Sequence, residues 1–355
     1  MRILHYEIVM NSFGLAMAER KLGHDNIVVE RKGGLHRLPV DKNLQLDRGN
    51  YFNKLFKLIT YFLKVRNSFD IFHFQFGLSF IDFEIKYFNH LDLPYYPKNV
   101  KLVFTYNGDD ARMNYSVVDG IDFNEYLRDY TITKAHFNKN RRLQKIKKVD
   151  RYAHHIFAVN PDLMNFLPER TSFLPYTMCN FYTIEKVNKR FDKENFTIVH
   201  APTNRMVKGT EFIEKALVKL REIYPFVQIV YVENVTNAEA LEIYKTADLL
   251  IDQVIIGWYG GLAVEVMRMG IPVACYLREE DFHFVPEEMI SDLKNAIIQI
   301  SPLNIVEPIQ KLIEDRKKLS EYAEHGFNYV TKWHDPLRVA QKVVEVYSRT
   351  LKPRN

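Results

Sequence analysis

The chain contains little cysteine and no long hydrophobic run that is free of charges. Its two cysteines, Cys179 and Cys275, are too few for a disulfide framework, which favours a reducing compartment. No uncharged apolar run reaches the roughly 18 residues that a membrane-spanning helix needs. The opening residues, MRILHYEIVM, lack the basic and apolar regions of a signal peptide. These absences predict a cytoplasmic protein whose contact with a membrane, if any, is peripheral and on the inner face.

The balance of charged residues says little about partners. Lys and Arg exceed Asp and Glu, 49 against 44, which gives a mild preference for acidic partners. No nucleic-acid recognition motif accompanies the basic stretches, so we expect no nucleic-acid partner. A chain of 355 residues is too long for one ordinary core, and two domains are therefore expected.

Short apolar runs alternate with longer helical patterns in both halves of the chain. Strands are expected at residues 2–9, 26–31, 70–76, 101–107 and 155–160, and again at 196–202, 227–234, 248–254 and 272–277. Helices are expected at 14–23, 209–225, 237–247, 260–270 and 335–351. This alternation predicts parallel sheets covered by helices, as two doubly wound α/β domains. The best linker is the segment 174–196, and we place the boundary near residue 185.

In such folds ligands bind beyond the carboxyl ends of the strands, so the loop after the strand at 196–202 is a candidate site. It reads PTNRMVKGTEF, with Arg205 and Lys208 just before a helix that opens at Gly209. A helix N-terminus beside two cations suits a diphosphate. The alternative is that both cations are solvated surface residues.

The stretch GWYGGLAVEVMRMGIPVACY places one glutamate, Glu265, inside an apolar run. A buried carboxylate is unfavourable unless it is paired, so this residue needs a partner. Gly257, Gly260 and Gly261 precede it and allow a ligand to approach the backbone closely. Glu265 either accepts hydrogen bonds from a ribose diol or complements the dipole of its helix. Together with the cationic loop, it predicts a nucleoside-diphosphate site in the second half of the chain.

Residues 198–275 resemble the donor half of GT-B glycosyltransferases, most of all glycosyltransferase family 4. The resemblance implies two Rossmann-like domains that face a central cleft, with no bound metal. It assigns Arg205 and Lys208 to the donor diphosphate and Glu265 to the donor ribose. It also implies an acceptor-binding domain over 1–185, a donor-binding domain over 186–335, and a closing helix over 336–355 that returns to the first domain.

The chain departs from the family pattern at several positions. The family has a second glutamate eight residues before the ribose-binding one, where this chain has Gly257; Asp252 and Gln253 lie nearby as substitutes. In the first half, VFTYNGDDAR resembles a family stretch with Asn107 in place of a histidine. Gly14 stands alone in the first loop, where a glycine pair is common.

Two residues of the first half are candidates for catalysis. His73 resembles the strand-end histidine of the family, and it either faces the cleft or is a satisfied core histidine. Asp110 lies in the NGDDAR stretch, where Gly108, Asp110 and Arg112 match the family stretch that it resembles. We predict His73 and Asp110 as catalytic residues. No metal site is expected, since Asp109-Asp110 is better explained by a turn.

Two basic stretches bear on the acceptor. Residues 134–151 are densely cationic, and either a solvated helix face or a lipid-linked acceptor explains them. Residues 51–66 form an amphipathic pattern, with Asn53, Lys54, Lys57 and Lys64 on one face and Phe52, Leu55, Phe56, Ile59 and Phe62 on the other. Such a helix either lies on an anionic membrane or packs its apolar side into the core.

The function that these features predict is transfer of a sugar from a nucleotide sugar to an acceptor hydroxyl. The acceptor expected is a glycan or lipid-linked saccharide of cell-surface polysaccharide assembly, and the family resemblance implies retention of configuration. Two alternatives remain. One is a sugar-nucleotide epimerase of the same fold, and the other is a catalytically silent partner of another transferase.

Overall fold

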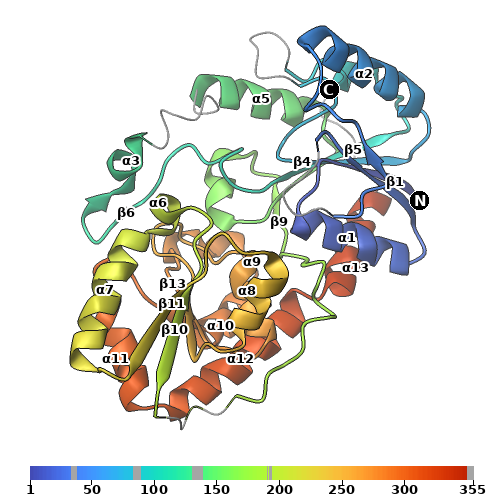
Figure 1. Ribbon diagram of the computed structural model, residues 1–355. Helices are drawn as coiled ribbons and strands as arrows, with labels where there is room; N and C mark the ends of the chain where they lie inside the picture. The colour runs from blue at the N-terminus through green and yellow to red at the C-terminus, as the bar shows by residue number, and fades with distance from the viewer. Residues whose placement is uncertain (33–37, 83–88, 130–138, 190, 192–193, 350–355) are drawn as a thin grey trace. The chain divides into compact units, whose positions relative to one another are not determined.

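The computed structural model describes residues 1–32, 38–82, 89–129, 139–189, 191 and 194–349 (Figure 1). The chain divides into two compact units. Unit 1 comprises Met1–Met113, Lys134–Cys179 and Pro336–Asn355, and unit 2 comprises Asn114–Thr133 and Asn180–Asp335. Each unit contains a parallel sheet flanked by helices, which confirms the predicted doubly wound α/β class.

Unit 1 is built on a seven-stranded sheet with the order β3-β2-β1-β4-β5-β8-β9. All its pairings are parallel. The strands are β1 (Arg2–Tyr6), β2 (Asp25–Glu30), β3 (Lys42–Asn43), β4 (Ile71–Gln75), β5 (Lys101–Tyr106), β8 (His155–Ala158) and β9 (Ser172–Phe173). The longer helices are α1 (Met10–Lys21), α2 (Tyr51–Val65), α5 (Lys139–Tyr152) and α13 (Pro336–Ser348), with 3-10 turns η1 (Leu93–Tyr95) and η3 (Pro161–Phe166). All five strands predicted in the first half are present.

The last helix of the chain belongs to unit 1. Apolar residues of α13, among them Val339 and Val343, share a buried cluster with Leu15 of α1 and Ile3 of β1. Helix α1 packs closely against the backbone of Thr177 at Gly14, where an added Cβ would lie 1.8 Å from the Thr177 carbonyl oxygen. Gly14 thus lies inside α1 and not in a loop as predicted, and this close approach explains why the position has no side chain.

Unit 2 is built on a five-stranded parallel sheet with the order β11-β10-β12-β13-β14. The strands are β10 (Phe196–His200), β11 (Val227–Tyr231), β12 (Leu249–Ile251), β13 (Val273–Cys275) and β14 (Ile297–Gln299). The helices are α6 (Arg205–Lys208), α7 (Thr210–Ile223), α8 (Asn237–Tyr244), α9 (Gly261–Arg268), α10 (Glu287–Ala296), α11 (Val306–Glu314) and α12 (Lys317–Trp333), with the 3-10 turn η4 (Glu279–Phe284). Its inner strands are continuous apolar runs, because helices cover both faces of the sheet.

A short hairpin from the first half of the sequence belongs to unit 2. It consists of β6 (Val117–Val118), β7 (Ile121–Asp122) and α3 (Phe123–Tyr126). The rings of Phe123 and Tyr126 pack against Phe212 of α7, with centroids 5.9 and 5.5 Å away. Among the described residues, no helix is long and apolar enough to cross a membrane.

Candidate functional site

The predicted donor residues gather at the carboxyl edge of the unit 2 sheet. Strands β10 and β12 are parallel neighbours. After β10 the short helix α6 leads into α7, and after β12 a loop leads into α9; a glycine precedes both α7 and α9. Gly209 precedes α7 with φ +74°, and Gly260 precedes α9; neither helix has a side-chain cap. Gly261 is the first residue of α9. Two uncapped helix N-termini therefore arise from adjacent strands, which is a favourable setting for an anion.

Lys208 joins the two loops of this edge through a buried carboxylate. Its Nζ lies 2.5 Å from Oδ1 of Asp252, whose side chain is fully buried at the end of β12. The other oxygen of Asp252 accepts a hydrogen bond from the backbone N–H of Gly260, at 2.8 Å. Asp252 thus holds both the Lys208 ammonium group and Gly260, the residue that precedes α9. The resulting position of Lys208 beside Gly260 is one that a diphosphate could reach.

Arg205 lies on the same short helix, α6, but is engaged by acidic neighbours. Its guanidinium donates to Glu214 and, at 2.6 Å, to Glu233. The hydrogen bond to Glu214 is the main reason that the pKa of Arg205 is raised. The side chain is 45% exposed, so these pairs are solvent-screened and open to exchange with a ligand. A diphosphate would replace one or both glutamates as its partner.

Glu265 is buried in α9, with 5% exposure, and its partner is an amide. Nδ2 of Asn180 donates to Oε1 of Glu265 at 2.5 Å. Burial raises the pKa of Glu265, and hydrogen bonds from Asn180 and Asn237 oppose that shift. In the part of the chain that the structure describes, the donors to this carboxylate are neutral amides, which leaves it suited to further hydroxyl donors such as those of a ribose.

The raised pKa of Glu265 predicts a pH-dependent stability difference. A carboxyl whose pKa is higher in the folded state favours folding below its unfolded pKa, and this contribution is lost as the pH rises through the folded pKa. Glu265→Gln has no ionisable group at this position, so the variant does not lose this stability as the pH rises. We expect the free energy of unfolding of the variant, relative to wild type, to increase between about pH 4 and pH 7. Urea unfolding at both pH values tests this, and a pH-independent difference contradicts it.

Gly257, at the position of the missing family glutamate, has no room for a side chain. An added Cβ would lie 2.2 Å from Cβ of Arg278 and 3.1 Å from its backbone nitrogen. The carbonyl of Gly257 also accepts a hydrogen bond from Arg278 N–H at 2.9 Å. Asp252 and Gln253, the two proposed substitutes for that glutamate, have other partners. Asp252 pairs with Lys208, and Gln253 donates to the carbonyl of Trp258.

Replacing Gly257 by alanine is expected to destabilise the protein by about 1–3 kcal/mol, because the clash involves backbone and Cβ atoms that cannot move independently. The matched control is Gly260→Ala, whose added Cβ would have no neighbour closer than 3.4 Å. Denaturant unfolding of both variants measures the difference. Equal stabilities would show that the loop before α9 adjusts freely.

A buried histidine that the sequence analysis did not single out supports this edge. Nδ1 of His200 lies 2.8 Å from the carbonyl of Ile251, and Nε2 lies 2.8 Å from Oγ1 of Thr210. Because a carbonyl only accepts, Nδ1 carries the proton and Nε2 accepts from the threonine hydroxyl. Burial lowers the pKa of His200, in keeping with this neutral form. His200 links β12 to the first residue of α7; its only sequence signal is its position at the end of a strand.

In unit 1, His73 occupies the place of a core histidine, the second of its two alternatives. It is fully buried in β4, with Nδ1 2.6 Å from the Tyr347 hydroxyl and Nε2 2.7 Å from Oγ1 of Thr105. Burial holds the pKa of His73 well below its usual range. Both ring nitrogens have partners inside the unit, as the core-histidine alternative predicts, and a catalytic role for His73 stays a prediction.

Asp110 shapes the turn after β5. Its carboxylate accepts from the backbone N–H of Asn107, at 2.9 Å, and of Gly108, at 2.6 Å. Burial raises the pKa of Asp110, and these hydrogen bonds oppose the shift. Arg112 continues the turn with a bidentate pair to Asp162, at 2.6 and 3.2 Å. The NGDDAR stretch therefore forms a hydrogen-bonded turn that the Asp110 carboxylate holds together, and a catalytic role for Asp110 stays a prediction.

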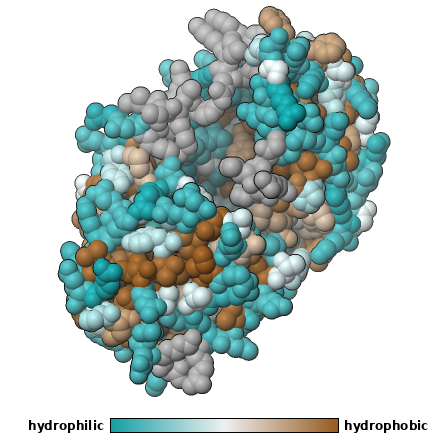
Figure 2. Space-filling view, in the orientation of Figure 1, coloured by the Kyte–Doolittle hydropathy of each residue, from teal (hydrophilic) through white to brown (hydrophobic). Residues whose placement is uncertain are grey.

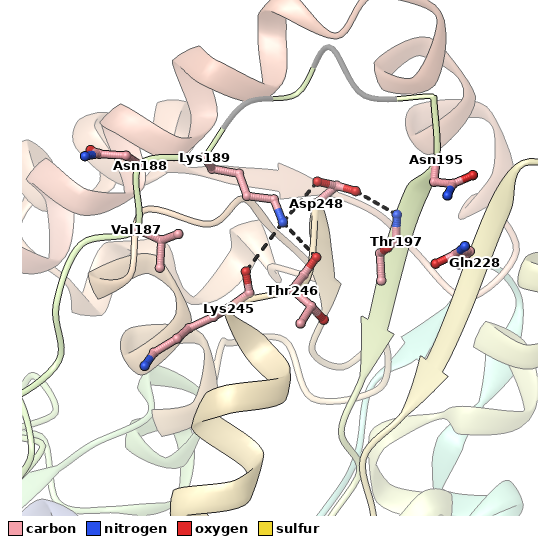
Figure 3. A pocket seen from close by; sticks show the side chains of 9 residues that line it. All are labelled: Val187, Asn188, Lys189, Asn195, Thr197, Gln228, Lys245, Thr246 and Asp248. Atoms are coloured by element: carbon pink, nitrogen blue, oxygen red, sulfur yellow. Dashed lines mark hydrogen bonds and ion pairs between the residues drawn. The ribbon is translucent and has the colours of Figure 1, made fainter.

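A cavity of about 540 Å³ lies at the opposite, amino-terminal edge of the unit 2 sheet (Figure 3). Within it, Lys189 Nζ lies 3.2 Å from Asp248 Oδ1, and the Asp248 carboxylate accepts from the N–H of Thr197 at 2.8 Å (Figure 3). These contacts tie the loop before β12 to the start of β10. The cavity is remote from the strand ends that carry the candidate site. Among the described residues, no cluster of His, Cys, Asp and Glu is placed to hold a metal ion.

Comparison with known proteins identifies the fold. No protein-family model matches the chain, and no curated protein matches its sequence. Among solved structures it resembles a sucrose-phosphate synthase from Thermosynechococcus elongatus, with a TM-score of 0.65 and 14% identity over 98% of both chains. It also resembles HepE from Anabaena in complex with UDP and glucose, with a TM-score of 0.62 and 13% identity over 98% of this chain and 99% of that one.

A third similar structure is a protein from Listeria monocytogenes described as a UDP-N-acetylglucosamine 2-epimerase. Its TM-score is 0.53 at 11% identity, over 100% of this chain and 98% of that one. These likenesses extend over nearly the full length of each protein. The chain has the GT-B fold, which confirms the architecture implied by the sequence resemblance.

Proposed function

We propose that the protein is a glycosyltransferase that moves a sugar from a nucleotide sugar to an acceptor hydroxyl. The observation that carries this proposal is the carboxyl edge of the unit 2 sheet. There, two adjacent strands lead into glycine-initiated helices, and Lys208 lies between them. Arg205 and Lys208 hold the diphosphate, Gly209, Gly260 and Gly261 give it access to the backbone, and Glu265 accepts from the ribose diol.

The chemistry that this edge supplies is stabilisation of the leaving diphosphate. Negative charge grows on the diphosphate as the glycosidic bond breaks, and preorganised N–H groups and cations stabilise it. This requires no metal ion, and we propose a metal-independent reaction that retains configuration. His73 and Asp110 act as positioning residues in unit 1, because their polar atoms are used within the unit.

For the acceptor we propose a glycan or lipid-linked saccharide used in cell-surface polysaccharide assembly, on the inner face of the membrane. Support for a UDP-sugar donor comes from HepE, whose structure contains UDP and glucose. That support is a likeness of fold, so the donor panel described next is needed to identify the nucleotide base and the sugar of the donor.

Incubation with UDP-, GDP- and ADP-sugars tests the proposal. Without acceptor, we expect binding and at most slow hydrolysis of one donor. With lipid-linked saccharide acceptors, we expect release of the matching nucleoside diphosphate. Conversion of the donor to its epimer, seen by NMR without any acceptor, would establish the epimerase that the Listeria likeness allows. Failure to bind any donor would instead support a silent partner protein.

A further inference from the structure

Helix α2 presents an apolar stripe to solvent. Phe52, Phe56 and Leu63 are 77%, 71% and 55% exposed, and Ile59 lies between them at 36%. Their spacings of four, three and four residues place all of them on one face of the helix. The residues that α2 buries are different ones, Leu58, Phe62 and Val65. The helix therefore packs one apolar face into the core, as one of the two sequence alternatives predicts, and has a second apolar face exposed.

Two exposed lysines flank the apolar stripe on one side. Lys57 and Lys64 each lie about 100° around the helix from Phe56 and Leu63, whereas Lys54 lies on the far side, and residues 48–69 contain no Asp or Glu. Within the part of the chain that the structure describes, none of these lysines forms an ion pair. Figure 2 shows hydrophilic and hydrophobic side chains side by side over α2, at the upper right of the view. Aromatic side chains beside unpaired lysines are complementary to lipid headgroups and the acyl chains beneath them.

The surface continues beyond the end of α2. Arg66 donates from Nη1 to the carbonyl of Tyr95 at 3.2 Å, and the Tyr95 side chain is 63% exposed. A tyrosine at the rim of such a surface has an apolar ring and a polar hydroxyl, as is usual at the boundary between headgroups and acyl chains.

The second basic stretch, around α5, is different. Arg142 is buried and donates to the carbonyl of Arg112, and Lys145 pairs with Asp82 at 2.8 Å. Lys148 donates to the carbonyl of Asn89 at 2.8 Å. These three cations are thus used inside unit 1, while residues 134–138 lie outside the described residues. Of the two basic stretches, as far as the structure describes them, α2 is the one that combines exposed aromatic rings with exposed lysines.

We propose that α2 is a membrane-docking helix for bilayers that contain anionic phospholipid. Phe52, Phe56 and Leu63 insert among the upper acyl chains, and the flanking Lys57 and Lys64 bind the phosphate groups above them. A second copy of the chain is a poorer occupant, because a symmetric interface would bring two lysine stripes together. The docking surface is separate in sequence from the nucleotide-binding residues of unit 2, and this inference does not depend on the proposed donor site.

Flotation of the full chain with vesicles tests this inference. We expect binding to vesicles of phosphatidylglycerol and phosphatidylcholine, and much weaker binding to phosphatidylcholine alone. Phe52→Ser combined with Phe56→Ser should lower the partition coefficient by at least about tenfold. Replacing Lys57 or Lys64 by glutamine should lower it by roughly fivefold each, and high salt should reproduce that loss.

The matched control is Val218→Ser combined with Leu303→Ser, two residues of unit 2 that are 48% and 67% exposed. This control should float like wild type, and circular dichroism checks that every variant folds. Equal flotation of the Phe52→Ser/Phe56→Ser variant and wild type overturns the proposal. So does a dimer in sedimentation velocity that the same variant dissociates, because α2 would then be a protein interface.

Discussion

Replacing Glu265 by glutamine is expected to weaken nucleotide-sugar binding by roughly tenfold to a hundredfold, as for loss of hydrogen bonds to a charged group. A carboxylate accepts from both hydroxyls of a ribose diol, whereas an amide presents one acceptor and one unsuited donor. The folded state should persist, since the variant removes a desolvated charge and keeps the side-chain volume. Calorimetric titration with UDP and UDP-sugars measures the change in affinity.

The control for Glu265 is Asp248→Asn. Asp248 is also a carboxylate of unit 2 with 5% exposure, but it precedes β12 at the opposite edge of the sheet. We expect this variant to lose stability, because Asp248 accepts from Thr197 and pairs with Lys189, and to bind donor as wild type does. An unchanged affinity in Glu265→Gln would refute the ribose assignment and leave the residue a structural role.

Replacing Lys208 by methionine should destabilise the folded protein by about 3–5 kcal/mol. The substitution leaves the carboxylate of Asp252 fully buried without its cation. The hydrogen bond from Gly260 N–H remains, but one neutral donor does not compensate a buried charge. Urea unfolding at neutral pH measures the loss, and a change below about 1 kcal/mol would mean that solvent screens this pair.

A double variant separates the structural and binding roles of Lys208. Adding Asp252→Asn to Lys208→Met removes the orphaned charge and should restore most of the stability. Affinity for a nucleoside diphosphate should stay low in the double variant, because the cation is still missing. Recovery of both stability and affinity would show that Lys208 serves only to neutralise Asp252.

The order of most strands and helices along the chain was predictable from the sequence, because each of these strands is a short apolar run and most helices are longer and amphipathic. The strands β1, β2, β4, β5, β8 and β10–β13 all appear where the sequence places them. No sequence pattern predicted β14 or helices α10–α12. The strand has three residues and follows α10 without a turn signal, so no local pattern separates it from the helix.

The candidate site was predictable as far as single loops allow. The positions of Lys208, Gly260 and Glu265 follow from the rule that ligands bind where parallel strands end. Their partners do not follow from it, because contacts such as Asn180 with Glu265 join segments 85 residues apart. The same limit applies to His73, whose strand-end position gave no sign that Tyr347 and Thr105 occupy both ring nitrogens.

The most direct test of the central claim is thermal unfolding against a panel of nucleoside diphosphates and nucleotide sugars. A ligand at about 100 times its dissociation constant adds roughly 2.7 kcal/mol to the stability of the folded state. We predict a selective shift with one base that Arg205→Ala and Glu265→Ala both abolish. A shift that survives in both variants, or no shift with any ligand of the panel, would contradict a nucleotide-sugar site at this edge of the unit 2 sheet.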